Sequence, residues 1–329
     1  MQNAVIASTG SYVPEWKLPN SYFNELLDED VDTWLRENLT IRERHWCRED
    51  ESTADLCLKA AERALKNGGI PVRDLDLIII ATDTPEYISP STASVVQHRL
   101  NADNAGTFDI NTACAGFVTA LDVGAKYIKS DTQYRNIMVI GAYAMSKFLD
   151  KTDKKTVTLF ADGAGAVILR AESSDDRGFL TSLLRTEGRY HDWMGIYAGG
   201  AHLPITPAVL AQHDQYLKFV RKFPKELNPE IWQKMVRQMA DTIGVKPADV
   251  DHFFFTQLNI NSIHQTMDEL GLPRERAHTI MDRFGYTGSA CIPMALDDAV
   301  KRHKVRRGDL VFFIGSGGGL AFAGAAFRY

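Results

Sequence analysis

The stretch FDINTACAGFVTALDVGAKY, residues 108–127, places a single cysteine, Cys114, among small side chains. The residues before it are typical of a buried strand, and those after it repeat apolar side chains at α-helical spacing. Cys114 therefore lies at the junction between a strand and a helix. A cysteine in such a position can be a reactive nucleophile or a small buried hydrophobic residue, and the pattern alone leaves both open.

Reactivity at this junction would depend on the ionisation of the thiol. A thiol is a poor nucleophile until it ionises, and the unpaired N–H groups at a helix N-terminus favour the thiolate. The position therefore predicts a lowered pKa for Cys114. Its neighbours Ala113, Ala115 and Gly116 are small enough to let a thioester approach the sulfur.

Strand-like and helical segments alternate along the whole chain. Short apolar runs closed by turn residues, such as LDLIIIATD and GDLVFFIGSGGG, are typical of buried strands. Between them, TADLCLKAAERALKNGG shows helical periodicity and ends in a glycine pair suited to a helix C-terminus. This alternation predicts an α/β protein with largely parallel sheets that are covered on both faces.

The order of these segments repeats once. LDLIIIATDT is similar to VDHFFFTQLN, and TFDINTACAGFVTALD is similar to HTIMDRFGYTGSACIPMALD, at an offset of about 175 residues. That offset is far longer than the repeats of solenoid proteins. We therefore expect two related halves, residues 1–172 and 173–329, in which Cys114 and Tyr286 occupy equivalent junctions.

One segment of the second half, residues 186–228, has no counterpart between the elements of the first half. It is rich in aromatic residues, histidine and glycine. It is interpreted as an insertion that forms a lid or a wall of a substrate site, or as a plain surface excursion.

Composition excludes several classes of protein. The 329 residues carry a net charge of −5, which does not favour nucleic acid as a partner. No apolar run approaches the roughly 18 residues that span a membrane, and the N-terminus lacks the pattern of a secretory signal. The four cysteines are scattered, without metal-ligand spacing. We expect a cytoplasmic protein with free thiols, no metal and no membrane or nucleic-acid partner.

A family resemblance runs nearly end to end, with its motifs in the right order. The segments GSYVPEW, IRERHW, IIIATDTPEYISPSTAS, DINTACAGFVTAL, LFADGAGAVIL, LDDAV and GSGGGLAFAGAAFRY resemble the β-ketoacyl-acyl carrier protein synthase III family of the thiolase superfold. The resemblance implies a five-layer α-β-α-β-α fold of two pseudo-repeated halves, usually a homodimer. It implies that Cys114 accepts an acyl group from coenzyme A or acyl carrier protein, in fatty-acid, polyketide or specialised metabolism, with no permanently bound cofactor.

The resemblance also implies an oxyanion hole made by the backbone N–H groups of Cys114 and Gly318. Glycine lets a backbone amide face a developing oxyanion without a Cβ in the way. One such donor is worth on the order of 3 kcal/mol in the transition state. The alternative for the GSGGG segment is a turn between strands with no chemical role.

The chain departs from the family at two positions beside the nucleophile. The family places a histidine where this chain has Thr256, in FTQLN, and an asparagine where it has Tyr286, in GYT. Threonine and tyrosine can each donate one O–H, so donor capacity survives in an altered geometry. Neither is a good general base at neutral pH. Thr256 and Tyr286 are therefore expected to flank the sulfur as hydrogen-bond donors or as shape elements.

Three interpretations follow. The chain condenses acyl groups through a carbon nucleophile, or it transfers the acyl group to an oxygen or nitrogen nucleophile without decarboxylation, or it is a non-catalytic partner subunit of an active synthase. The second needs a base, for which His191 and His202 of the insertion are candidates, with exposed loop histidines as the alternative. Cys291, on the helix after Tyr286, is interpreted as core packing rather than a second reactive thiol.

The family binds the adenine of coenzyme A against a tryptophan, which matches Trp34, and contacts pantetheine with an asparagine, which matches Asn259. Two family arginines that bind phosphate are replaced by Asn38 and Asn261, and a third is replaced by Lys154. Lysine keeps the charge but not the bidentate fork of arginine. These departures from the family predict weakened coenzyme A binding and favour an acyl group delivered by a carrier protein or by a short thioester mimic.

Other cations are candidates for compensation. Arg36 and Lys155 lie near the replaced positions in the sequence. The basic run KRHKVRR, residues 301–307, is interpreted as a solvated helix end, with docking of an acidic carrier protein as the alternative.

Overall fold

The computed structural model describes residues 2–173 and 177–329 and contains two large β-sheets separated by buried helices, together with two two-stranded sheets. The first sheet has the strand order β1-β7-β6-β4-β5. Strand β4 runs parallel to β5 and β6, and β7 runs antiparallel to β1 and β6. The bounds are β1 (Gln2–Tyr12), β4 (Leu77–Ala81), β5 (Gly106–Ile110), β6 (Asn136–Ala144) and β7 (Asp162–Ser173).

The second sheet has the order β11-β12-β13-β8, with β11 parallel to β12 and β13 antiparallel to both of its neighbours. Its strands are β8 (Gly178–Thr186), β11 (His252–Phe255), β12 (Leu310–Gly317) and β13 (Ala321–Arg328). All strands of the first sheet precede residue 174 and all strands of the second follow residue 177. The expected division after residue 172 falls at the end of β7, and residues 174–176 lie outside the described part of the chain.

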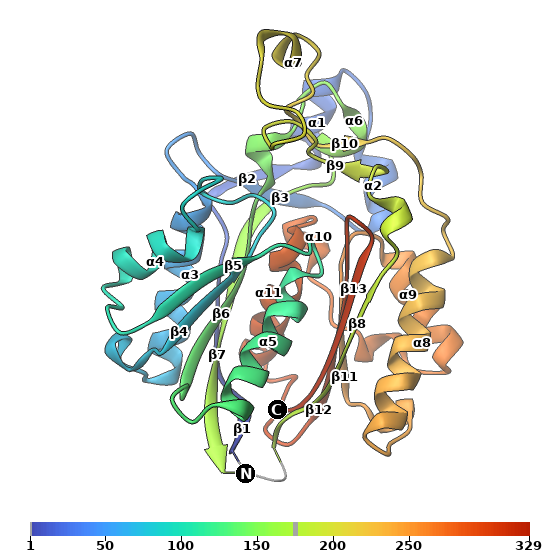
Figure 1. The fold of residues 1–329 in the computed structure, drawn as a ribbon. Helices are drawn as coiled ribbons and strands as arrows, with labels where there is room; N and C mark the ends of the chain where they lie inside the picture. The colour runs from blue at the N-terminus through green and yellow to red at the C-terminus, as the bar shows by residue number, and fades with distance from the viewer. Residues whose placement is uncertain (1, 174–176) are drawn as a thin grey trace.

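Six helices form three layers that alternate with the two large sheets (Figure 1). Helices α5 and α11 lie between the sheets, α3 and α4 cover the outer face of the first sheet, and α8 and α9 cover the second. Their bounds are α3 (Thr53–Gly68), α4 (Thr92–Leu100), α5 (Gly116–Ser130), α8 (Leu227–Thr242), α9 (Ile260–Leu270) and α11 (Cys291–Lys301). The layers follow the expected order α-β-α-β-α.

The middle layer explains why α5 is apolar on nearly all sides. A helix between two sheets contacts both of them, so most residues of α5 are buried. The outer helices α3 and α8 bury one face only. The turn that leads into α11 also packs closely against the first sheet. A Cβ at Gly141 of β6 would lie 2.2 Å from the carbonyl oxygen of Ser289, so this contact requires a glycine.

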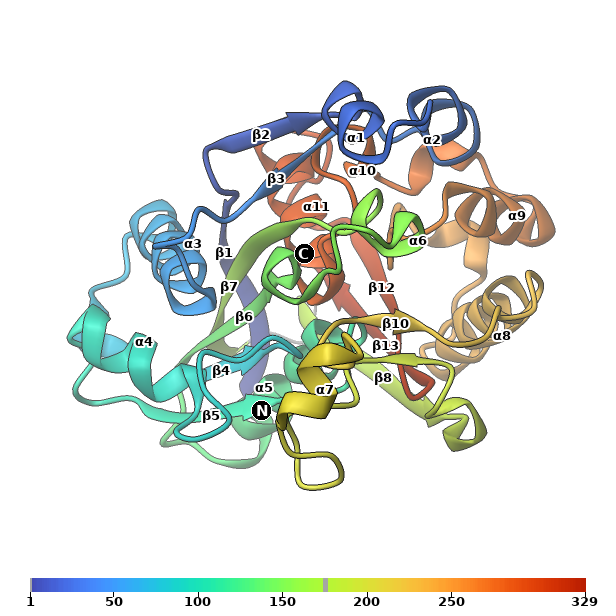
Figure 2. The same ribbon diagram turned by 90° about the horizontal axis from the view of Figure 1, so that it is seen from above.

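Short elements gather at one end of the molecule, the upper end in Figure 1, and Figure 2 shows that end from above. They are β2 (Trp16–Pro19), α1 (Asn20–Leu27), α2 (Asp32–Leu39), β3 (Glu43–Trp46), α6 (Lys154–Val157), β9 (Met194–Gly195), α7 (Pro207–Ala211), β10 (Lys218–Phe219) and α10 (Met281–Phe284). The 3₁₀ helices are η1 (Val72–Asp74), η2 (Met145–Phe148), η3 (Gly188–Tyr190), η4 (Pro247–Asp249), η5 (Arg274–Arg276) and η6 (Gly288–Ala290). Within the described ranges, no helix combines the length and the hydropathy that crossing a membrane requires.

Candidate active site

A cavity of about 520 Å³ extends from the surface of the molecule to the buried Cys114. Trp34 of α2 lies at its outer end with 54% of its surface exposed, whereas Cys114 at the inner end is 2% exposed. The insertion supplies one wall of this cavity and is therefore more than a plain surface excursion, whereas its role in a substrate site stays a prediction. The insertion residues that line the cavity are Met194, Lys222, Phe223, Pro224, Lys225, Leu227 and Asn228.

Cys114 lies in a sharp turn between β5 and α5. Ala113 before it has a φ of +45°, a left-handed conformation that costs energy for a residue with a Cβ. The turn is closed by hydrogen bonds from the Ala115 N–H to the Thr112 carbonyl at 3.1 Å and from the Gly116 N–H to the Ala113 carbonyl at 2.8 Å. Helix α5 begins two residues after the cysteine, as the sequence predicts.

The expected lowering of the thiol pKa is wrong. Burial raises the pKa of Cys114 well above its ordinary value, the charge of Asp83 raises it further, and a hydrogen bond from Tyr286 opposes both. Desolvation of the thiolate therefore outweighs any benefit from the start of α5. The Cys114 sulfur is therefore a neutral thiol at neutral pH.

Tyr286 is brought directly to the nucleophile. Its side chain is 1% exposed, and its hydroxyl is hydrogen-bonded to the Cys114 thiol. Both backbone polar groups of Tyr286 are hydrogen-bonded. Its N–H donates to the Leu159 carbonyl, and its carbonyl accepts from the Ala161 N–H, each at 2.9 Å. Burial raises the pKa of Tyr286 well above its ordinary value, so the phenol stays protonated at neutral pH and can act as a donor.

Thr256 follows β11 and also lines the cavity beside Cys114. Its Oγ1 accepts a hydrogen bond from the Ser316 N–H at 2.9 Å, and its own N–H donates to the Ile314 carbonyl at 3.1 Å. Because a threonine hydroxyl can accept and donate at once, the O–H remains available as a donor toward the cavity. The structure thus brings Cys114, Thr256 and Tyr286 to one site.

The glycine segment after β12 packs against the turn of the nucleophile. A Cβ at Gly317 would lie 2.5 Å from the Cys114 nitrogen and 2.6 Å from the Thr112 carbonyl oxygen. Gly317 lines the cavity, whereas Gly318 does not, and a Cβ at Gly318 would lie 3.4 Å from the carbonyl oxygen of Met194. Its role in an oxyanion hole stays a prediction.

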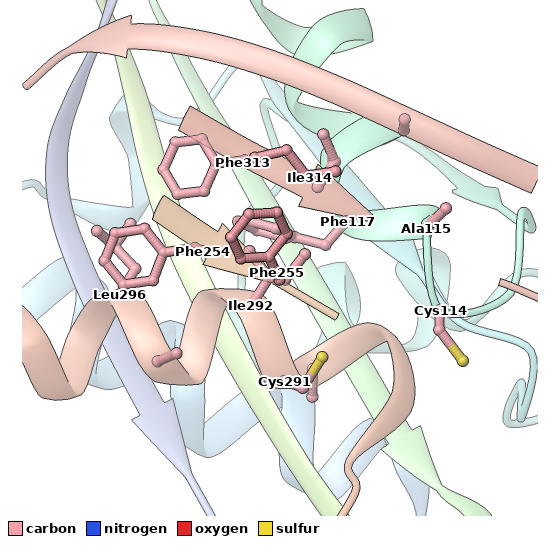
Figure 3. Packing of buried hydrophobic residues seen from close by; sticks show 14 of the residues in the cluster. Cys114, Ala115, Phe117, Phe254, Phe255, Cys291, Ile292, Leu296, Phe313 and Ile314 are labelled. Atoms are coloured by element: carbon pink, nitrogen blue, oxygen red, sulfur yellow. The ribbon is translucent and has the colours of Figure 1, made fainter. Parts of the chain in front are cut away.

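The two histidines proposed as bases do not reach the cavity. His191 and His202 are both exposed, and neither lines it, so the interpretation of either as the base for an acceptor is wrong. Cys291 is 1% exposed within the main hydrophobic core, and burial raises its pKa to about 12. Figure 3 shows Cys291 on α11 beside packed phenylalanines, with Cys114 on the facing loop, and core packing of Cys291 is confirmed.

Both the sequence of the chain and its fold have close counterparts. A model of 3-oxoacyl-[acyl-carrier-protein] synthase III matches residues 108–188, and its C-terminal model matches residues 240–329. A β-ketoacyl-[acyl-carrier-protein] synthase III of Xanthomonas campestris pv. campestris is 36% identical over 329 residues, covering 98% of each chain. The chain belongs to the synthase III family.

Solved structures agree with that membership. The 3-oxoacyl-[acyl-carrier-protein] synthase III of Aquifex aeolicus superimposes with a TM-score of 0.88 at 33% identity, covering 99% of this chain and 100% of the other. The priming β-ketosynthase of the R1128 polyketide pathway superimposes with a TM-score of 0.90 at 26% identity, covering 99% and 96%. The five-layer arrangement described above is therefore the thiolase-like fold of this family.

The resemblance to synthase III assigned several residues to carrier binding. The structure places some of these residues at the cavity and others away from it. Trp34, Asn38, Asn259 and Asn261 all line it. The side chain of Asn259 accepts a hydrogen bond from the Asn261 N–H at 3.0 Å and caps α9. The side chain of Asn261 donates to the Asn38 carbonyl at 2.9 Å, so the two positions that replace family arginines hold each other.

The cations expected near the carrier site lie elsewhere. Lys154 forms an ion pair with Glu29, and Arg36 lies 3.6 Å from the Asp32 carboxylate. Neither residue lines the cavity, and Lys155 does not line it either. Two lysines that the sequence reasoning missed, Lys222 and Lys225, are exposed at the cavity wall instead. In the sequence, only their position inside the insertion of residues 186–228 indicated that they could lie at the site.

Two further residues near Cys114 had no family motif to identify them. Tyr143 of β6 is 1% exposed, and its ring lies 6.5 Å from that of Tyr286. Asp83 lies two residues after β4, and burial raises the pKa of its carboxyl to about 6. Within the described residues, no group of three or more His, Cys, Asp or Glu side chains could hold a metal.

Proposed function

We propose that this chain is an acyltransferase in which Cys114 takes an acyl group from a coenzyme A or acyl carrier protein thioester and transfers it to a carbon nucleophile. The observation that carries the proposal is the position of Cys114 at the inner end of a cavity whose outer end is the exposed Trp34. The names of the relatives, a β-ketoacyl-[acyl-carrier-protein] synthase III and a priming β-ketosynthase of a polyketide pathway, support the same reaction.

The proposed chemistry begins with attack of the Cys114 sulfur on the thioester carbonyl. The N–H groups of Cys114 and Gly318 stabilise the tetrahedral oxyanion. In the second half-reaction, a malonyl acceptor loses carbon dioxide, and the hydroxyls of Thr256 and Tyr286 donate to its thioester carbonyl as the enolate develops. The enolate carbon then bonds to the acyl carbon, and the bond from that carbon to the Cys114 sulfur breaks. Two O–H donors thereby replace the family's histidine and asparagine, and neither residue is asked to act as a base.

The carrier lies along the cavity in this proposal. Trp34 packs against an adenine ring, Asn259 contacts the pantetheine arm, and Lys222 and Lys225 face the phosphates. Lysine is a point charge without a bidentate geometry, so the phosphates of coenzyme A and of a carrier protein are both accommodated.

Intact-mass measurement after incubation with acyl-coenzyme A and acyl carrier protein thioesters tests the acyl-enzyme. An acyl adduct is expected on the native chain and not on Cys114→Ala. Absence of the adduct on the native chain, or its persistence in Cys114→Ala, overturns the proposal.

Two alternatives are resolved by further measurements. Carbon dioxide release from malonyl carriers by the acylated protein supports condensation, whereas acyl transfer to an alcohol or amine without it supports O- or N-acyl transfer. Because His191 and His202 are exposed and do not line the cavity, O- or N-acyl transfer lacks the base that was proposed for it. A chain that forms no adduct and co-purifies with a complete synthase would be a partner subunit.

We also propose a homodimer in the cytoplasm. Strand β5 is at the edge of the first sheet, and the loop after β4 exposes 54% of Tyr87 and 85% of Ile88. An open strand edge beside exposed apolar side chains favours pairing with a second copy. The four free thiols suit a reducing compartment. Sedimentation of the purified chain tests the dimer.

A further inference from the structure

Four aromatic rings from separate segments of the chain converge beside the nucleophile, and we refer to them as the ring cluster. They are Tyr143 of β6, Phe160 just before β7, Phe219 of β10 and Tyr286 between α10 and η6. Phe160 lies at the centre of the cluster. The centroid of its ring is 5.3 Å from that of Tyr286, 6.3 Å from that of Tyr143 and 6.2 Å from that of Phe219.

The ring cluster closes the inner end of the cavity. Of the four rings, only Tyr286 lines the cavity that holds Cys114, and its hydroxyl is hydrogen-bonded to the Cys114 thiol. Phe160 is 0% exposed, and Tyr143 and Tyr286 are 1% exposed each. Space as large as a water molecule is therefore absent around the Phe160 ring in the described part of the chain.

The rings are fixed by contacts of the backbone around them. Phe160 and Tyr286 form a parallel β-bridge, and the Phe160 carbonyl accepts a hydrogen bond from Trp46 Nε1 at 3.0 Å. A Cβ at Gly288 would lie 2.5 Å from the Tyr143 ring, so the backbone already touches that ring. Because protein interiors are close-packed, an added methylene group at such a place forces its neighbours to move.

The space beside the sulfur is small on the remaining sides as well. Cys114 is 2% exposed, and the strand end at Gly317 is packed directly against its turn. In the proposed function, the carrier arm occupies the path from Cys114 to Trp34. An acyl group joined to the same carbonyl carbon must therefore fit at the inner end of the cavity, against the ring of Tyr286.

We propose that the site accepts only short acyl groups, acetyl and propionyl, and that the ring cluster sets this limit, an inference that rests on the proposed acyl transfer. A longer chain would push the Tyr286 ring into that of Phe160. One methylene too many in a pocket of fixed size typically lowers the rate about tenfold or more. Tyr143, Phe160 and Phe219 act through Tyr286, so they determine specificity without touching the reacting atoms.

A series of acyl groups tests the limit. Acylation of the native chain by acetyl-, propionyl-, butyryl-, hexanoyl- and octanoyl-coenzyme A is followed by rapid quench and intact mass. Acylation is expected to be at least about tenfold slower with butyryl than with propionyl, with no octanoyl adduct. Phe160→Val should raise the butyryl rate about tenfold and leave the acetyl rate similar, because the Tyr286 ring can move into the space that valine leaves.

A second series measures the same space without acyl transfer. Methyl, butyl and hexyl methanethiosulfonate each attach an alkyl chain to a cysteine sulfur as a disulfide and release methanesulfinate. Modification of Cys114 in the native chain is expected with the methyl reagent and at least about tenfold more slowly with the hexyl reagent. Cys114→Ala gives the background from the other three thiols, which are buried. These two series on the native chain decide the limit without any substitution in the ring cluster.

Controls separate the size limit from a general loss of packing. Phe179→Val removes the same atoms in the second sheet, where the Phe179 ring packs against Phe327, and should keep the native size profile. Tyr286→Phe keeps the ring and should slow all acyl groups by the same factor.

Three outcomes contradict these expectations. Equal rates with acetyl and octanoyl groups on the native chain overturn the limit. An unchanged size profile in folded Phe160→Val overturns the role of the ring cluster. A native chain that is modified by methyl methanethiosulfonate but by no acyl thioester overturns the proposed function, and the acyl preference with it.

Discussion

The reactivity of a cysteine in this protein depends on what surrounds the sulfur more than on its place before a helix. Burial removes the water that would stabilise a thiolate, and the neighbouring Asp83 charge adds to the cost. Tyr286 provides the compensating contact, since its hydroxyl is hydrogen-bonded to the Cys114 thiol. At the scale of the residue, the site holds a neutral thiol beside a hydroxyl donor.

Removing the Tyr286 hydroxyl should therefore weaken the nucleophile without unfolding the protein. Tyr286→Phe keeps the ring packed 5.3 Å from Phe160 but loses the O–H that favours the thiolate. The pH midpoint of Cys114 alkylation by iodoacetamide is expected to rise and the acylation rate to fall about tenfold. An unchanged midpoint would contradict the hydrogen bond between Tyr286 and Cys114. Tyr190→Phe is the control, because the Tyr190 ring packs against Trp193.

The shielded carboxyl of Asp83 also affects the stability of the fold. The pKa of the carboxyl is about 6 in the folded chain against the ordinary 3.8, so the unfolded state releases its proton first as pH rises. The resulting loss of stability is absent below about pH 4 and complete above about pH 6, on the order of 3 kcal/mol. Asp83→Asn should melt at a higher temperature than the native chain at pH 7.5.

Thermal melts at several values of pH measure this effect. The difference between the two proteins should shrink as pH falls from 6 toward 4. A difference that is constant with pH would mean that the substitution acts through packing rather than through charge.

At the scale of the element, the position of the nucleophile depends on contact between segments of the two halves. The turn that carries Cys114 follows β5 of the first sheet, and the end of β12 in the second sheet lies directly against it. This contact allows no side chain at Gly317, because the Cys114 nitrogen and the Thr112 oxygen already occupy the space.

Gly317→Ala should displace the turn. Its Cβ would lie 2.5 Å from the Cys114 nitrogen, so a loss of about 1–3 kcal/mol in the free energy of unfolding and a slower acylation are expected. Denaturant unfolding and intact-mass kinetics measure both. Gly188→Ala, where a Cβ would meet no atom within 4 Å, is the matched control and should change neither.

At the scale of the whole molecule, the cavity joins surfaces from several parts of the chain. Helix α2 supplies Trp34 from the first half, and the insertion supplies Lys222 and Lys225 from the second. Asn38 and Asn261, which stand at two arginine positions of the family, carry no charge. The two lysines of the insertion therefore supply positive charge at the cavity.

These lysines should discriminate between carriers by charge. The double substitution Lys222→Glu and Lys225→Glu is expected to raise KM for acyl-coenzyme A roughly tenfold and to leave KM for the acyl N-acetylcysteamine thioester, which has no phosphate, almost unchanged. Lys234→Glu, exposed on α8 away from the cavity lining, controls for net charge. An equal rise in KM for both thioesters would contradict phosphate recognition.

Much of the fold could be predicted because its signals are local. Helix α5 begins at Gly116 and α3 spans Thr53–Gly68, where apolar periodicity and a glycine pair predict them. The correspondence between the junctions of Cys114 and Tyr286 also comes from pattern, and both residues reach one site. Lys154 and the histidines of the insertion could not be placed in this way, because position along the chain does not determine which surface a loop covers.

The amino-acid sequence by itself determined the alternation of strands and helices, the position of Cys114 before a helix and the two replacements, Thr256 and Tyr286. Each depends on residue type and on neighbours a few positions away. Only the tertiary structure decided the ionisation of Cys114 and the approach of Asp83. Both arise from desolvation and charge between residues that are distant in sequence, and those interactions exist only once the sheets and helices have packed.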